Sequence, residues 1–214
     1  MLGFLVLLAW DAVGLDLPIS RLFGGPAGFP LRDDWLFERV LHDGVRTAAW
    51  ALAAVLAIGL WRPLPIAPGL GRREIGAWLI AALACAALIP ALKHFNLTSC
   101  PWSLAEFGGT AMHVSHWRWG QGDGGPGQCF PAGHATAAFC FLPAWFVLRG
   151  RAPRAARVWL AATLVGGIIL TMVQVVRGAH FVSHSLWTAW CCWAVGVATE
   201  ALLRRGEPRL GRGR

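Results

Sequence analysis

Six apolar runs, separated by polar or glycine-rich stretches, set the pattern of this chain. A helix that crosses the hydrocarbon of a bilayer needs about 20 residues, and most of the runs approach that length. The first run is the least regular, because Asp11 and Asp16 interrupt it. The pattern predicts an all-α, polytopic six-transmembrane-helix bundle that forms one domain over 1–203, with spans at 2–17, 46–61, 75–92, 131–148, 158–176 and 182–203.

The stretches between the runs differ in character. A loop punctuated by glycine and proline precedes the second run and contains a predicted amphipathic piece at 35–41. A long polar, glycine-rich segment covers 93–130, where Asp123 reads as a turn residue. The arginine-rich tail 204–214 is predicted to be disordered and cytoplasmic.

Composition supports a membrane protein. Hydrophobic residues make up 56% of the 214 residues and charged residues only 14%, whereas a soluble domain carries about a quarter. The net charge of +8 would suit a nucleic-acid-binding protein. The basic residues, however, fall in short clusters between apolar runs, which is typical of membrane topology. We therefore expect the lipid bilayer, and no nucleic acid, as a partner.

The basic residues also predict an orientation. With six spans, one side of the membrane receives seven of them, interspersed with four acidic residues: Arg21, Arg32, Arg39, Arg46, Lys93, Arg118 and Arg177. The other side receives twelve: Arg62, Arg72, Arg73, Arg149, Arg151, Arg154, Arg157, Arg204, Arg205, Arg209, Arg212 and Arg214. The richer side should be cytoplasmic, with both chain ends. Segment 93–130 and the turn 174–182 then meet at the outer face.

Three polar islands converge at that outer face. They are "KHFNLTSCPW" at 93–102, "CFPAGHA" at 129–135 and "QVVRGAHFVSHS" at 174–185. Charged groups at membrane depth are costly and usually mark a function. The islands supply lysine, arginine and histidines without a nearby carboxylate, so we expect them to bind an anion such as phosphate.

These islands resemble the motifs of the type 2 phosphatidic acid phosphatase (PAP2) superfamily, which shares a core with vanadium haloperoxidases. The family pattern is K-x6-R-P, then P-S-G-H, then S-R-x5-H-x3-D. Here the chain reads K-x6-C-P from Lys93, then P-A-G-H ending at His134, then V-Q-x5-H-x3-H ending at His184. Order and internal spacing are kept over roughly 75–200, as in a divergent bacterial branch with a PAP2-like core.

The resemblance implies a role for each matched residue. His180 would be the nucleophile that forms a phosphohistidine, and His134 the general acid for the leaving alkoxide. Lys93 would bind phosphate, and Gly133 would allow the close approach of backbone N–H groups. Lys93 is also the only lysine among nineteen basic residues, which favours a specific role.

Three positions depart from the family pattern. Cys100 and Gln174 replace the motif arginines, and His184 replaces the aspartate that orients the nucleophile. Arg177, one helical turn from Gln174, is the expected substitute for the arginine, with Gln174 as a neutral donor. A neutral His184 would accept a hydrogen bond from the His180 ring without supplying negative charge.

The expected function is therefore that of a metal-independent phosphoric ester hydrolase without a cofactor. It would cleave a lipid phosphomonoester or diphosphate at the periplasmic face of a bacterial inner membrane. Transfer of the phosphate to an alcohol is a variant within the class. A catalytically silent relative that binds a lipid phosphate or a partner stays open.

The outer-loop cysteines leave two further possibilities. Cys100 and Cys129 each adjoin a motif, and in an oxidising periplasm they would be able to form a disulfide. Alternatively, both would join His113 and His116 in a zinc site of a zinc-dependent membrane hydrolase, although the surrounding residues match no recognised zinc pattern.

Overall fold

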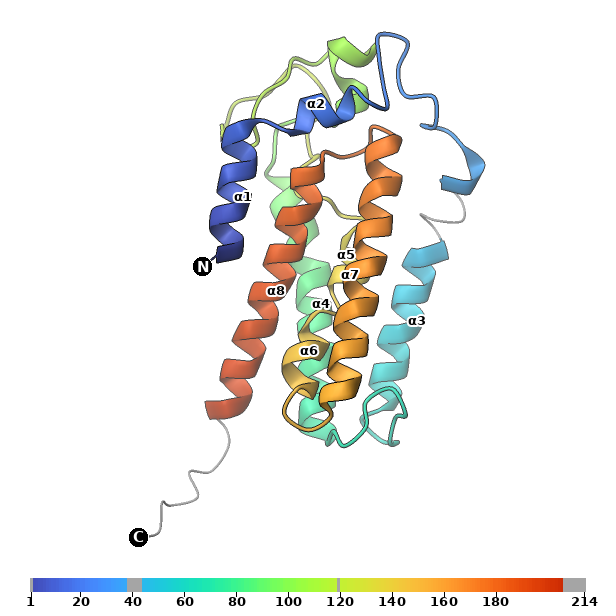
Figure 1. The fold of residues 1–214 in the computed structure, drawn as a ribbon, viewed down its shortest axis with the longest axis vertical. Helices are drawn as coiled ribbons and strands as arrows, with labels where there is room; N and C mark the ends of the chain where they lie inside the picture. Colours follow the sequence, from blue (N-terminus) through green and yellow to red (C-terminus); the bar gives the residue numbers. More distant parts are fainter. Residues whose placement is uncertain (1, 38–43, 119, 206–214) are drawn as a thin grey trace.

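The computed structural model describes residues 2–37, 44–118 and 120–205, and in these ranges the chain forms helices and no strands (Figure 1). The predicted all-α class is thus confirmed. The helices in chain order are α1 (Leu2–Val13), α2 (Asp16–Ser20), α3 (Val45–Ile58), α4 (Arg72–His94), the 3-10 helices η2 (Pro101–Ser103) and η3 (Ala105–Phe107), α5 (Thr136–Phe139), α6 (Pro143–Leu148), α7 (Pro153–Val176) and α8 (Val182–Arg205).

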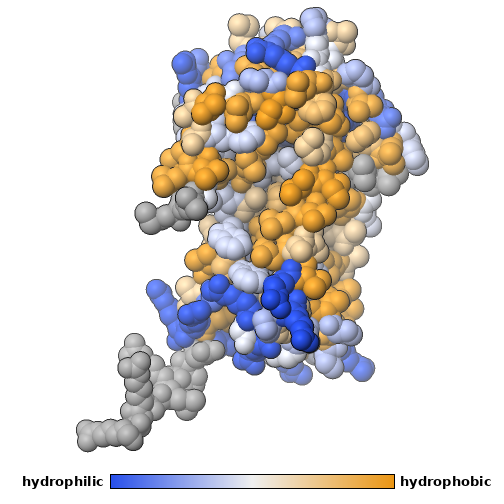
Figure 2. All heavy atoms as spheres, in the orientation of Figure 1, coloured by the Kyte–Doolittle hydropathy of each residue, from blue (hydrophilic) through white to orange (hydrophobic). Residues whose placement is uncertain are grey.

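Three helices are long and apolar enough to cross a membrane, namely α4, α7 and α8, which agree with the third, fifth and sixth predicted spans. Helix α3 has 14 residues, about 21 Å at 1.5 Å per residue, which is shorter than a bilayer core of about 30 Å. Figure 2 shows apolar residues across the middle of the molecule and a hydrophilic lower end. The chain is a helical membrane protein, and the predicted number of six spans is not confirmed.

The fourth predicted span, 131–148, is not one continuous helix. Residues 131–135 are not helical, and the helical part divides into α5 and α6. Pro143 begins α6 and accounts for the break, because proline has no N–H to donate and its ring clashes with the carbonyl group four residues earlier. The non-helical start of this segment lies beside α8, at the end of the bundle that we call the outer end after the orientation that the basic residues predict.

The first predicted span, 2–17, is not one continuous helix, because α1 ends at Val13 and α2 begins at Asp16. Helix α1 packs on the outer part of α8, where the Phe4 ring lies 5.7 Å from that of Trp187 and 5.3 Å from that of Trp190. The chain then turns into α2, which lies across the outer end of α8 (Figure 1). Gly14 follows the last residue of α1, and its φ of +70° is a common helix terminator, while the two aspartates that interrupt the run in the sequence bond to the outer part of the fold.

These aspartates hold the outer loops onto α8. Asp16 accepts hydrogen bonds from Ser183 N, at 3.0 Å, and from Ser183 Oγ, so it caps the first turn of α8 from a distant part of the chain. Asp11 Oδ2 accepts from the indole N–H groups of Trp117 and Trp187 at 3.0 and 2.9 Å. We call this set of contacts the aspartate clamp.

Two predicted boundaries need comment. Helix α8 continues to Arg205, so the first two residues of the predicted tail, 204 and 205, are helical. The rest of that tail, 206–214, lies outside the described residues, as do residues 38–41 of the predicted amphipathic piece.

Candidate active site

The first polar island begins on the last turn of α4. Lys93 lies there, at the outer end of the helix, partly buried. The C-terminal end of a helix carries partial negative charge, which favours a cation at this place. A Cβ atom built on Gly133 would lie 4.0 Å from Lys93 Nζ, so the ammonium group reaches the backbone of the second island.

Hydrogen bonds align the chain after Lys93 with the chain before His134. Asn96 Oδ1 accepts from Phe130 N at 3.1 Å and from Thr98 Oγ1 at 2.8 Å. The Asn96 carbonyl accepts from Gln128 N at 2.8 Å, and that of Thr98 accepts from Cys129 N at 3.0 Å. The first two islands are therefore fixed side by side.

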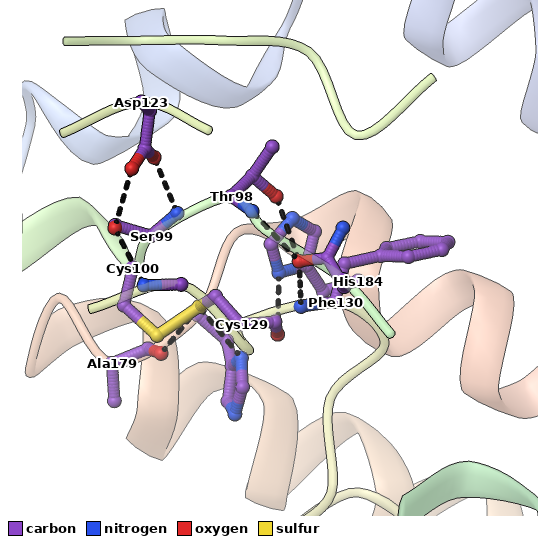
Figure 3. The surroundings of a disulfide bond; sticks show 11 residues. Thr98, Ser99, Cys100, Asp123, Cys129, Phe130, Ala179 and His184 are labelled. Atoms are coloured by element: carbon purple, nitrogen blue, oxygen red, sulfur yellow. Dashed lines mark hydrogen bonds between the residues drawn. A yellow bond between two sulfur atoms is a disulfide. The ribbon is translucent and has the colours of Figure 1, made fainter. Parts of the chain in front are cut away.

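A disulfide between Cys100 and Cys129 joins the same two segments, with an S–S distance of 2.01 Å (Figure 3). Next to it, the buried Asp123 accepts from both the backbone N–H and the hydroxyl of Ser99. It also accepts from Gly125 N at 3.0 Å. Asp123, which reads as a simple turn residue in the sequence, thus anchors the loop that carries Cys100.

The second island is anchored on α8. Ala132 N donates to the His184 carbonyl at 3.1 Å, and Thr188 Oγ1 donates to the Ala132 carbonyl at 2.9 Å. These bonds fix the backbone immediately before Gly133 and His134. The nearest atom to a Cβ added at Gly133 is Lys93 Nζ, at 4.0 Å, so the space beside this glycine is not filled by packing.

The third island turns sharply between α7 and α8 and presents His180. The Gln174 carbonyl accepts from Ala179 N at 2.8 Å and His180 N at 3.3 Å. Gly178 has φ +70°, and a Cβ there would lie 2.3 Å from the Phe29 ring, so only glycine fits. The turn brings the buried His180 ring to a centroid distance of 6.0 Å from the ring of His134.

The environment keeps His180 neutral. Burial is the main cause that holds the pKa of this imidazole well below its ordinary value of 6.5. The neighbouring His184, Lys93 and His134 act in the same direction, because a second positive charge among them is unfavourable. A neutral imidazole keeps a nitrogen lone pair, which a nucleophile requires.

Lys93, Gly133 and His134 line one cavity of about 400 Å³. Its other walls come mostly from apolar residues of α3, α4, α5 and α7, among them Trp50, Leu83 and Leu170. The cavity thus has a polar part formed by the motif residues and an apolar remainder. Such a division suits an amphiphile with an anionic head group and a hydrocarbon tail.

Two residues of this cavity were not predicted from the sequence. Arg46 of α3 lines it, and the residue reads in the sequence only as the start of a span. Thr136 also lines it, and the buried Thr136 Oγ1 has no hydrogen-bond partner among the described residues. Each could contact a bound polar group. In the sequence Thr136 is marked only by its place two residues after His134, and Arg46 lies far from every motif.

Gln174 and Arg177 lie at the outer end of α7 and differ in their contacts. The buried Gln174 side chain has no hydrogen-bond partner, for either amide atom, within the described ranges. The buried Arg177 donates from Nε to the Arg32 carbonyl at 2.8 Å, so part of its guanidinium group holds the outer loop. An unpaired buried amide costs about 1–3 kcal/mol per polar group, which favours a ligand at Gln174.

His184 does not bond to His180 as expected. His184 Nδ1 lies 3.1 Å from the Cys129 carbonyl oxygen, which can only accept, so Nδ1 carries the proton. The rings of His180 and His184 are 5.9 Å apart between centroids, and no hydrogen bond joins them within the part of the chain that the structure describes. The atom that faces His180 Nδ1 is instead Cys129 Sγ, at 3.4 Å.

The four expected zinc ligands are not gathered at one place. His116 Nε2 lies 3.3 Å from Asp11 Oδ2 and its ring stacks on Phe130, whereas His113 packs against Phe181. The group of three possible metal ligands found among the described residues consists of Cys100, Cys129 and His180. The disulfide occupies both sulfur atoms of this group, and a thiolate is the form that binds metal.

Comparisons with known proteins agree with the motifs. The sequence model of the PAP2 superfamily matches residues 74–205, which include every motif residue. The fold is similar to the crystal structure of a transmembrane PAP2-type phosphatidylglycerolphosphate phosphatase from Bacillus subtilis, with a TM-score of 0.58 and 17% sequence identity over 97% of this chain and 96% of that one. Curated proteins gave no match. The resemblance of the three motifs is thus confirmed, and the chain belongs to the PAP2 superfamily.

Proposed function

We propose that this protein is a membrane phosphatase that hydrolyses a lipid phosphomonoester or diphosphate through a phosphohistidine. One observation carries the proposal. Three segments far apart in the sequence bring Lys93, Gly133, His134 and His180 together, and the first three of these residues line a cavity whose other walls are mostly apolar. A lipid phosphate has the matching chemistry, with an anionic head group for the cations and a tail for the apolar walls.

The reaction follows from the positions of the two histidines. His180 Nε2 forms a bond to phosphorus while the bond from phosphorus to the leaving oxygen breaks, and His134 gives that oxygen a proton. Water then attacks phosphorus and gives its proton to His134, and the phosphorus–nitrogen bond breaks. Both histidines return to their starting state.

Phosphate would be held by fixed charges and dipoles. Lys93 supplies a cation beside Gly133, where backbone N–H groups can approach the oxygens. The unpaired Gln174 amide supplies a neutral donor, and Arg177 is proposed to add its remaining N–H groups. Fixed donors of this kind stabilise developing charge without a metal ion.

The active site is proposed to face the periplasm across a bacterial inner membrane. Arginine concentrates at the opposite end of the bundle, where Arg149 and Arg204 pair with Glu200, and Arg151 with Glu74. Excess basic residues favour the cytoplasm. A cysteine introduced by Arg62→Cys, at that end, should then react with a membrane-impermeant reagent only after the cells are lysed.

The main test is phosphate release by detergent-purified protein in EDTA. Phosphatidic acid, phosphatidylglycerolphosphate and a polyprenyl diphosphate form the substrate panel, the second because the similar Bacillus subtilis protein is named for it. Wild type should release phosphate, whereas His180→Ala and His134→Ala should not. His94→Ala is the matched control, because this exposed histidine adjoins Lys93 and should be dispensable.

A catalytically silent relative is the second candidate, favoured by one observation. The contact at His180 Nδ1 is a neutral sulfur atom, which cannot stabilise a positive imidazolium as a carboxylate would. Phosphate release from none of the lipids, with lipid-phosphate binding intact, would support this candidate. Activity that EDTA abolishes and zinc restores would contradict both.

A further inference from the structure

The disulfide touches the proposed nucleophile directly. Cys129 Sγ lies 3.4 Å from His180 Nδ1 and 3.4 Å from the carbonyl oxygen of Ala179, the residue before His180. Cys129 is fully buried and His180 is 3% exposed, so water does not separate them. The position at which the family pattern predicts a carboxylate contact is therefore occupied by one sulfur atom of a disulfide.

Cys129 itself is fixed on every side. Its N–H donates to Thr98, its carbonyl accepts from His184 Nδ1, and its sulfur is bonded to Cys100. Figure 3 shows these bonds around the disulfide, with the Ser99–Asp123 contacts beside Cys100. His184 thus acts on His180 indirectly, because it fixes Cys129, whose sulfur atom faces the His180 ring.

We propose that the Cys100–Cys129 disulfide is the positioning element of His180, in place of the aspartate that this chain lacks. The inference rests on the proposed function, in which His180 attacks through Nε2. A disulfide sulfur has no hydrogen and accepts weakly, so the tautomer that it favours carries the proton on Nδ1. The lone pair is then on Nε2, where the reaction needs it.

Reduction would reverse this preference. A free Cys129 thiol is a donor, and at 3.4 Å its S–H would donate a hydrogen bond to the lone pair of His180 Nδ1. The ring proton would then reside on Nε2, and the attacking lone pair would be lost. A thiol and an imidazole in contact also ionise as a pair, so the activity would gain a new dependence on pH. Reduction therefore changes the chemistry of the nucleophile as well as the restraint on its loop.

Two variants separate positioning from simple cross-linking. Cys100→Ala breaks the disulfide and leaves the Cys129 thiol at His180, whereas Cys100→Ala/Cys129→Ala breaks it and removes the donor. We expect Cys100→Ala, and wild type treated with a phosphine reductant, to lose kcat on the order of 10-fold or more, with an added ionisation in the pH profile. The double variant should keep the wild-type shape of the profile.

EDTA is present throughout, because the ligand atoms of Cys100, Cys129 and His180 lie within 4.8 Å of one another and freed thiols would bind zinc. Phosphine added to the double variant is the control and should change nothing. Equal losses of kcat and identical pH profiles for the single and double variants would overturn the proposal, because a disulfide that only cross-links the two loops predicts that result. Unchanged kcat in the reduced enzyme would overturn it as well.

A readout without activity keeps this test separate from the proposed function. Nitrogen NMR of 15N-histidine-labelled protein reports which ring nitrogen carries the proton, and the His180→Ala spectrum assigns the His180 signals. We expect Nδ1–H in the oxidised protein and Nε2–H after reduction. The same tautomer in both states would refute the positioning role even if no lipid is hydrolysed, whereas a tautomer change without hydrolysis would refute only the phosphatase.

Discussion

Replacement of Gly133 by alanine tests the proposed phosphate site most directly. The added Cβ would meet no atom closer than Lys93 Nζ at 4.0 Å, which is an ordinary contact, and φ at this residue is not in the left-handed region. The fold should therefore accept the methyl group. Alanine at a compatible position stabilises a protein by about 0.4–1 kcal/mol, because it restricts the unfolded chain.

Activity should respond in the opposite direction. The methyl group would occupy space between Gly133 and Lys93, where we place a phosphate oxygen. Displacement of a reacting group by about 1 Å costs about 100-fold in rate. We thus expect kcat/KM to fall about 100-fold, which corresponds to about 2.7 kcal/mol of transition-state stabilisation.

Phosphate release and thermal unfolding, followed by tryptophan fluorescence, measure the two effects on the same preparation. Gly167→Ala is the matched control, because a Cβ there would lie 2.0 Å from the Phe139 ring, and it should lower the unfolding temperature. If Gly133→Ala retained the wild-type kcat/KM, no phosphate oxygen would lie beside Gly133 and the proposed site would be refuted. A lower unfolding temperature for Gly133→Ala would show that the glycine is structural.

Three further predictions concern stability and binding. Gln174→Leu should raise the unfolding temperature of the ligand-free protein, because it removes an unpaired buried amide that costs about 1–3 kcal/mol. The same change should raise KM, and an unchanged KM would exclude Gln174 from the site. Asp16→Ala should cost about 1–2 kcal/mol by removing the cap on Ser183, and an unchanged unfolding temperature would contradict that cap. Acidification below about pH 6.5 should lower the unfolding temperature. Burial holds the pKa of His113, His116 and His180 below the unfolded value, so the unfolded chain binds more protons than the folded chain at such pH. An unfolding temperature that does not change with pH would contradict these shifts.

Local sequence patterns were sufficient to predict those features of the fold and the site that depend on a single segment of the chain. Helices α4, α7 and α8 could be predicted because each is a long apolar run whose burial in a bilayer needs no information from elsewhere. Lys93, His134 and His180, which the fold brings near one another, could be singled out because their spacing within each island matches the family pattern.

The failures concern residues whose partners lie far along the chain. Asp11 and Asp16 weakened the first predicted span, yet only the fold reveals that they bond to the start of α8, more than 160 residues away. The expected bond from His184 to His180 failed for the same reason. Cys129 intervenes, and its position depends on loop pairing that no local pattern encodes.

The aspartate clamp has a consequence for how the protein is made. Asp11 and Asp16 leave the ribosome more than 160 residues before their partners Ser183 and Trp187 of α8. The bonds from these two carboxylates to α8 therefore form only after α8 has been made. Closure of this end then follows the insertion of α8, so a chain that stalls before α8 would lack the bonds that fasten its first helices to the bundle.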